Sequence, residues 1–116
     1  MIGNNSHAPL AGIRVLDLAT EHAELTGRLL ADLGAQVIKA EPHGGAASRR
    51  MPPFDEQQPS KSLYWAYVGA GKTSIVLDIT SVEGRRRFLE LVAGADVLIE
   101  SFRPGFLESL KYDYAT

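Results

Sequence analysis

Residues 9–41 read PLAGIRVLDLATEHAELTGRLLADLGAQVIKAE, and this stretch decides the fold. Residues 13–18 form a short apolar run, which predicts a buried strand. Leucines recur at helical spacing over residues 25–33, and Gly34 is placed to end that helix. A second apolar run begins at residues 37–38. This order predicts a strand, a crossover helix and a parallel strand, the repeating unit of open α/β sheets.

The remaining chain continues this order after a long Gly- and Pro-containing loop over residues 42–61. The patterns predict a short helix at 62–68, a strand at 73–78, a helix between Ser81 and Gly94, a strand at 96–101 and a short helix at 106–110. The fold class is therefore α/β, a Rossmann-like open parallel sheet with flanking helices. We expect a flexible leader over residues 1–8 and a partial domain over 9–116, because nothing in the chain covers the remaining sheet face or edge.

Composition excludes several classes of function. The 116 residues carry a net charge of −2, which does not suggest a nucleic-acid surface. We expect the basic cluster at residues 85–87 to be a solvated helix face. The chain has no cysteine and three scattered histidines, which predicts no disulfide, no thiolate nucleophile and no metal site. No apolar stretch is long enough to cross a bilayer, and we predict a cytoplasmic protein that binds no membrane.

Two nucleotide-binding motifs are incomplete in this sequence. The sequence GAGKTS at residues 69–74 resembles part of a phosphate-binding P-loop, but it precedes a predicted strand, whereas a P-loop follows one and opens a helix. No G-x-G-x-x-G follows the first strand. Acidic residues stand in its place, at Glu21 and Glu24, and they would repel a pyrophosphate. ATP, GTP, NAD and FAD are therefore not the expected ligands.

Two loops after predicted strands are better candidates, because open sheets bind ligands at the carboxyl ends of their strands. Gly44 and Gly45 are followed by Arg49 and Arg50, and arginine matches phosphate oxygens in a bidentate way. The alternative is an ordinary loop whose arginines face water. Residues 101–105, SFRPG, combine a tight turn with a flat apolar side chain; a turn with a core phenylalanine explains them equally well.

Taken together, several segments resemble the N-terminal region of the class III CoA-transferases, the group of formyl-CoA transferase, carnitine CoA-transferase and α-methylacyl-CoA racemase. The matching segments are PLAGIRVLDL (9–18), LLADLGAQVIKAE (29–41), GKTSIVLDI (71–79) and EGRRRFLELVAGADVLIESFRPG (83–105). They stand in family order and cover most of the chain. The resemblance implies the N-terminal part of a large Rossmann-type domain that holds coenzyme A, in a protein that forms homodimers.

The resemblance also implies which residues contact coenzyme A or acyl-CoA. Carried over to this sequence, they are Glu21, His22, Ala23, Pro42, Arg49, Arg50, Leu77, Asp78, Ile79, Thr80, Ser101, Phe102 and Arg103. The substrates implied are an acyl-CoA and a carboxylic acid, and the reaction is CoA transfer or acyl-CoA isomerisation. The family's catalytic aspartate lies downstream and matches no residue here, so no catalytic residue is assigned and the chain alone is expected to be inactive.

Departures from the family pattern support an alternative to the CoA-binding function. The family's Ala-Gly-Pro turn is replaced by Ala23-Glu24-Leu25, and an arginine of the last helix by Ser109. A degenerate, non-catalytic binding or interaction module, or a truncated fragment, would explain these changes. Self-association of the isolated chain is expected, because an uncovered apolar sheet attracts partners.

Overall fold

The computed structural model describes residues 7–20 and 23–112. Four parallel strands form one sheet in the order β3-β2-β1-β4. The elements in chain order are β1 (Arg14–Leu18), α1 (Glu24–Asp32), β2 (Gln36–Glu41), the 3₁₀ helix η1 (Ala47–Arg50), α2 (Leu63–Val68), β3 (Lys72–Val76), α3 (Val82–Ala93), β4 (Val97–Glu100) and α4 (Phe106–Ser109). The α/β fold class is thereby confirmed.

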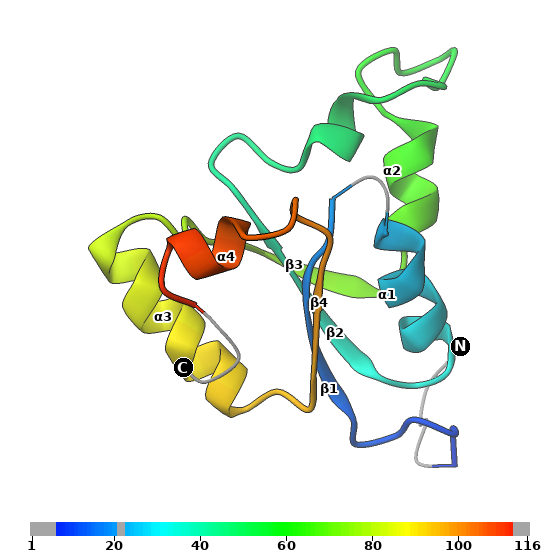
Figure 1. Cartoon of the computed structure of the whole chain (residues 1–116). Coiled ribbons are helices and arrows are strands. Elements are labelled where there is room, and N and C mark those ends of the chain that lie inside the picture. The colour runs from blue at the N-terminus through cyan, green and yellow to red at the C-terminus, as the bar shows by residue number, and fades with distance from the viewer. Residues whose placement is uncertain (1–6, 21–22, 113–116) are drawn as a thin grey trace.

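Helices lie on both faces of the sheet, whereas the edge strands β3 and β4 keep mostly exposed residues, so the cover is partial. Figure 1 shows α1 and α2 on one side, and α3 and α4 on the other. The loops that follow β1, β2 and β4 lie together above the upper end of the sheet, with η1 beside them. These loops leave the carboxyl ends of the strands, where an open parallel sheet presents its ligand site.

Side chains of β1 alternate between the two faces, as the pleat of a strand requires. Val15 belongs to a buried cluster with Ala35 and Val37 on the α1 face. Leu16 and Leu18 belong to the second cluster, on the α3 face. Both faces of β1 are buried, which explains why the strand reads as a nearly continuous apolar run.

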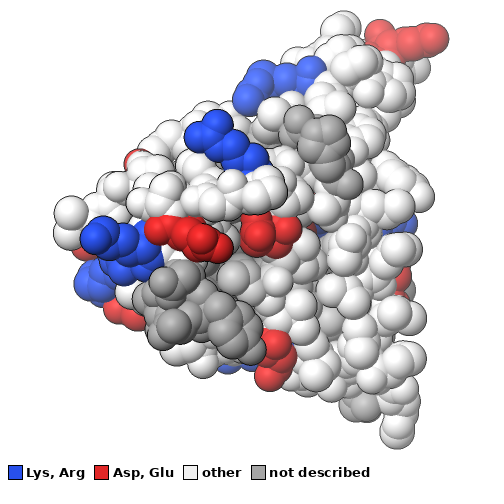
Figure 2. Space-filling view, viewed as in Figure 1, with Lys and Arg blue, Asp and Glu red and all other residues white. Residues whose placement is uncertain are grey.

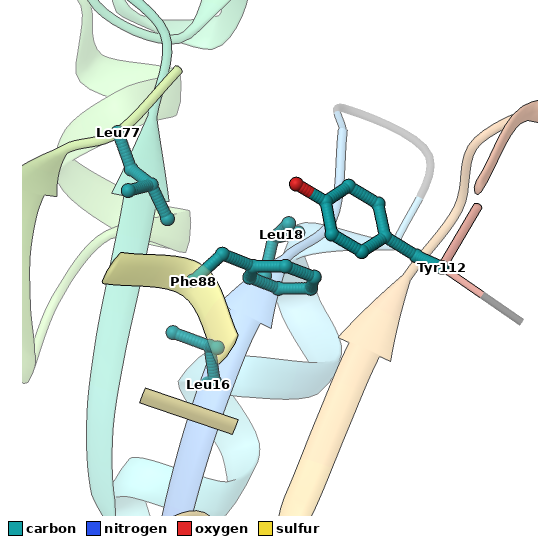
Figure 3. Close-up of a cluster of buried hydrophobic side chains, with 5 residues drawn as sticks. All are labelled: Leu16, Leu18, Leu77, Phe88 and Tyr112. Atoms are coloured by element: carbon teal, nitrogen blue, oxygen red, sulfur yellow. The ribbon is translucent and has the colours of Figure 1, made fainter. Parts of the chain in front are cut away.

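The larger apolar cluster fills the space between the sheet and α3. Figure 3 shows the Phe88 ring from α3 beside Leu16 and Leu18, with the Tyr112 ring next to it. The two rings meet edge to face, with centroids 4.8 Å apart. The Tyr112 hydroxyl donates to the Ile79 carbonyl at 2.8 Å, which ties the end of the described chain to the loop after β3.

The predicted elements are confirmed, with three corrections. The third strand ends at Val76 rather than residue 78, because Asp78 turns the chain by accepting a hydrogen bond from the Thr80 amide. The long loop contains η1, which its Gly- and Pro-rich composition concealed. Arg85 is not a purely solvated residue: its guanidinium lies 4.5 Å from the Tyr112 ring centroid and donates to the Leu110 carbonyl.

Candidate functional site

A cavity of about 320 Å³ opens at the carboxyl ends of the strands. Its walls are mostly apolar and come from the loops after β1, β2, β3 and β4. The described residues that line it are Leu18, Ala19, Thr20, Glu24, Lys39, Ala40, Pro42, Ala46, Ala47, Leu77, Asp78, Ile79, Thr80, Phe102 and Phe106. We call this cavity the carboxyl-edge pocket.

Basic and acidic side chains surround this end of the molecule. In Figure 2, basic patches lie over η1 and the loop that leads into it, and acidic side chains lie across the middle of the same face. Arg49 and Arg50 are the arginines of η1. A ligand that combines an apolar ring with phosphates could place its ring against the apolar walls of the pocket and its phosphates beside these arginines.

The loop after β3 forms one rim of the pocket. Asp78 Oδ1 accepts hydrogen bonds from the Thr80 amide at 2.9 Å and from the Thr80 hydroxyl at 2.5 Å. These bonds lower the pKa of Asp78 below its usual value, so the carboxyl group is ionised at neutral pH. The rim therefore offers a charged hydrogen-bond acceptor beside the apolar side chains of Leu77 and Ile79.

The loops after β1 and β4 are joined by a hydroxyl pair. Ser101 Oγ accepts from the Thr20 amide at 2.8 Å and lies 2.8 Å from Thr20 Oγ1. This contact fixes the backbone on either side of the pocket entrance. Phe102 follows directly, lines the pocket, and packs against Phe106 with ring centroids 4.9 Å apart.

Glu41, the last residue of β2, holds the following loop in place. Its Oε1 accepts from the Ala46 amide at 2.7 Å and from Arg49 Nε at 2.6 Å, and its Oε2 accepts from Arg49 Nη2 at 2.8 Å and from the Ser74 hydroxyl. Burial by itself would raise the pKa of Glu41, but the hydrogen bonds from Arg49, Ser74 and Ala46 outweigh it and lower the pKa to about 2. The Arg49 guanidinium also lies 4.3 Å from the Trp65 ring centroid.

Four charged side chains are buried beneath the start of α1. Lys39 Nζ lies 3.2 Å from Glu24 Oε2 and 3.7 Å from Asp17 Oδ1, and it donates to the Ala19 carbonyl. Lys72 Nζ lies 2.7 Å from Asp17 Oδ2 and donates to the Glu24 carbonyl at 2.8 Å. All four side chains are at most 2% exposed. We call Asp17, Glu24, Lys39 and Lys72 the buried quartet.

Residues 10–116 match the family model described as CoA-transferase family III. This chain belongs to that family. It is 40% identical over 108 residues to a probable fatty acyl-CoA transferase of Mycobacterium tuberculosis, covering 92% of this chain and 27% of the relative. It is 42% identical over 108 residues to an acetyl-CoA:oxalate CoA-transferase of Acetobacter aceti, covering 91% and 27%.

Solved structures agree with this assignment. A CAIB/BAIF family protein from Brucella suis matches with a TM-score of 0.82 and 38% identity, over 93% of this chain and 29% of that chain. This chain thus spans about 27–29% of the length of these relatives. The predicted resemblance to the class III CoA-transferases and the predicted Rossmann-like fold are both confirmed.

The structure brings about half of the predicted site residues to one place. Those that line the carboxyl-edge pocket are Pro42, Leu77, Asp78, Ile79, Thr80 and Phe102. Ala23, Arg49, Arg50, Ser101 and Arg103 are described but are not among the residues that line it. Glu21 and His22 lie outside the described residues. The assignment of all these residues to coenzyme A stays a prediction.

Glu24 and Lys39 line the pocket although they are not among the residues predicted from the sequence. One signal for Lys39 was its position within the apolar run of the second strand, where a charge requires a buried partner. One signal for Glu24 was an acidic residue at the position where a dinucleotide site needs glycine. Within residues 7–20 and 23–112, no three potential metal ligands come together, and no helix has the length and apolar character that crossing a membrane requires.

Proposed function

We propose that this part of the chain binds the CoA moiety of an acyl-CoA, within a protein that transfers CoA between carboxylic acids. The observation that carries the proposal is the carboxyl-edge pocket, because it joins segments that the family resemblance independently assigns to CoA. The named relatives are CoA-transferases, which favours transfer over isomerisation. The activity belongs to the whole protein, as does the predicted homodimer.

The chemistry of the pocket suits the adenine end of CoA. Leu18, Ile79 and Phe102 offer apolar surface to a flat ring. Asp78, ionised at the rim, accepts hydrogen bonds from hydroxyl or amino groups and repels phosphate. We therefore place the ring inside the pocket and the phosphates outside it.

Among the predicted arginines, Arg50 suits phosphate better than Arg49. Nε and Nη2 of Arg49 both donate to the Glu41 carboxylate, and the Trp65 ring lies beside the Arg49 guanidinium. Arg50 is exposed and donates through Nη1 to the Gly44 carbonyl at 3.0 Å. Arg103, also exposed, follows the pocket residue Phe102 and is the second candidate.

Calorimetric titration of the chain with coenzyme A, at low and moderate salt, tests the proposal. We expect saturable binding that weakens with salt, because dissolved ions screen the Coulomb attraction between the phosphates and the arginines. Arg50→Ala should weaken binding by about tenfold, equivalent to one charge-assisted hydrogen bond of about 1.4 kcal/mol, and should reduce the salt dependence.

The matched control is Arg87→Ala, which removes an exposed arginine from α3, on the face of the sheet away from α1. It should leave CoA affinity unchanged. Absence of binding at millimolar CoA would contradict the proposal and favour the non-catalytic scaffold. Equal losses of CoA affinity for Arg50→Ala and Arg87→Ala would mean that the net charge of the chain, and not a specific contact of Arg50, determines the affinity.

A further inference from the structure

The buried quartet is electrically balanced, with two carboxylates and two ammonium groups. The Lys39 ammonium has three N–H donors. They face the Ala19 carbonyl, Glu24 Oε2 and Asp17 Oδ1. Lys39 lines the carboxyl-edge pocket, yet its positive charge is already paired within the protein. The carboxylates of Glu24 and Asp17, 3.2 and 3.7 Å away, compensate that charge, so Lys39 has little attraction for an anionic ligand while Glu24 is present.

Glu24 places a negative charge in the first turn of α1. It is the first residue of α1, where the helix dipole and the unpaired amides attract negative charge. Its Oε2 accepts from the Ser48 hydroxyl at 2.9 Å and pairs with Lys39. The start of a crossover helix is a common anion site in open α/β sheets, and here a carboxylate of the protein already lies in the first turn, paired with Ser48 and Lys39.

The second oxygen of Glu24 gives an independent indication. Oε1 is buried and has no hydrogen-bond partner among the described residues, although Glu24 lines the pocket. A carboxylate held with one oxygen unpaired adds negative potential to this wall. The wall thus favours apolar groups or hydrogen-bond donors, and it disfavours phosphates and carboxylates.

We propose that Glu24 is a specificity-determining residue: a built-in anion that keeps the charged groups of the ligand out of the carboxyl-edge pocket. The inference rests on the proposed function where the ligand is taken to be CoA. The ring of the ligand enters the pocket, and its phosphates stay at the rim beside η1. Replacing Glu24 should turn the same wall into an anion site, because Lys39 then lacks its nearest carboxylate.

Chemical rescue by formate tests this inference without CoA, so its failure is distinguishable from failure of the proposed function. The unfolding temperature of Glu24→Ala is followed while formate replaces chloride at constant ionic strength. We expect a lowered unfolding temperature that formate restores in a saturable manner, because formate fills the space of the lost carboxylate. Wild type and the control Glu83→Ala, whose carboxylate pairs with Arg86 on the surface of α3, should not respond.

A second variant covers the case in which Glu24→Ala does not fold. Glu24→Gln keeps the side-chain volume but leaves the quartet with one net positive charge. Titration with inorganic phosphate should show binding at least fivefold tighter than in wild type, whereas Glu83→Gln, with the same change in net charge, should match wild type. Equal responses of wild type and the Glu24 variants, to formate or to phosphate, would overturn the inference.

Discussion

The two faces of the sheet at its central strand β1 are both buried, but by different chemistry. On the α3 face, Leu16, Leu18 and Phe88 form an apolar cluster. On the α1 face, the same strand β1 places Asp17 after Val15, and β2 places Lys39 and Glu41 after Val37. Along β2 the residues at positions 37, 39 and 41 are all buried, so the α1 face becomes progressively charged toward the pocket.

This difference has an energetic meaning. An apolar face is stabilised in proportion to the area removed from water, and it accepts many side chains of suitable volume. A buried ion pair contributes little net stability, but removal of one partner leaves a charge that neither water nor protein compensates. The α1 face should therefore be intolerant of changes that the α3 face accepts.

The largest expected effect is on the charged face. Lys72→Met keeps an unbranched side chain of similar length but leaves Asp17 Oδ2 without its ammonium partner at 2.7 Å. We expect a loss of about 3–5 kcal/mol in the free energy of unfolding, measured by urea denaturation at pH 7.

A double variant separates the loss of the ion pair from the cost of an unpaired charge. Asp17→Asn combined with Lys72→Met removes both members of the pair and should lose less than the single change, because no uncompensated charge remains. The control Lys61→Met changes an exposed lysine of the loop before α2 and should stay within about 0.5 kcal/mol of wild type. A loss below 1 kcal/mol for Lys72→Met would mean that Asp17 does not need a lysine to compensate its buried charge.

The apolar face was largely predictable from sequence, and the charged face was not. Strands and helices follow from local periodicity, which records apolar spacing directly. Ion pairs of the quartet join residues that are far apart in the chain, such as Asp17 with Lys72, and periodicity carries no information about such partners. Asp17 interrupts the apolar run of β1 and has no exposed surface, but the sequence does not indicate which lysine compensates its charge.

The site divides in the same way. The rule that ligands bind at the carboxyl ends of parallel strands located the pocket segments, because it depends only on strand order and direction. Roles of individual arginines depend on which carboxylate each one meets. Arg49 meets Glu41, eight residues earlier, only because η1 folds the intervening loop back onto β2. No pattern in the sequence predicted that short helix.

The second prediction concerns pH and the outer end of the charged face. The pKa of Glu41 is about 2 in the folded chain against an ordinary value of 4.5, so its interactions stabilise the fold above pH 4.5 and are lost as the pH falls toward 2. Glu41→Gln should lose at most about 3 kcal/mol at pH 7, less to the extent that water screens the half-exposed Arg49.

As the pH falls below 4.5, the free energies of unfolding of wild type and Glu41→Gln should converge. Wild type then loses the stabilising interactions of the Glu41 carboxylate, which the variant already lacks. Urea denaturation at pH 7, 5 and 3.5 measures the difference at each pH. Glu90→Gln, on the exposed surface of α3, is the control and should change neither the stability nor its pH dependence appreciably. A constant difference between wild type and Glu41→Gln at every pH would contradict the lowered pKa.

The smallest expected effect is on the apolar face. Phe88→Leu replaces a wholly buried ring by a branched apolar side chain in the cluster of Figure 3. We expect a loss of about 1–1.5 kcal/mol, because Leu16, Leu18 and Tyr112 can close part of the space and no polar group is left unpaired. Urea denaturation under the conditions used for Lys72→Met makes the two values directly comparable. If Phe88→Leu costs as much as Lys72→Met, the faces do not differ in tolerance, and packing rather than charge pairing governs both.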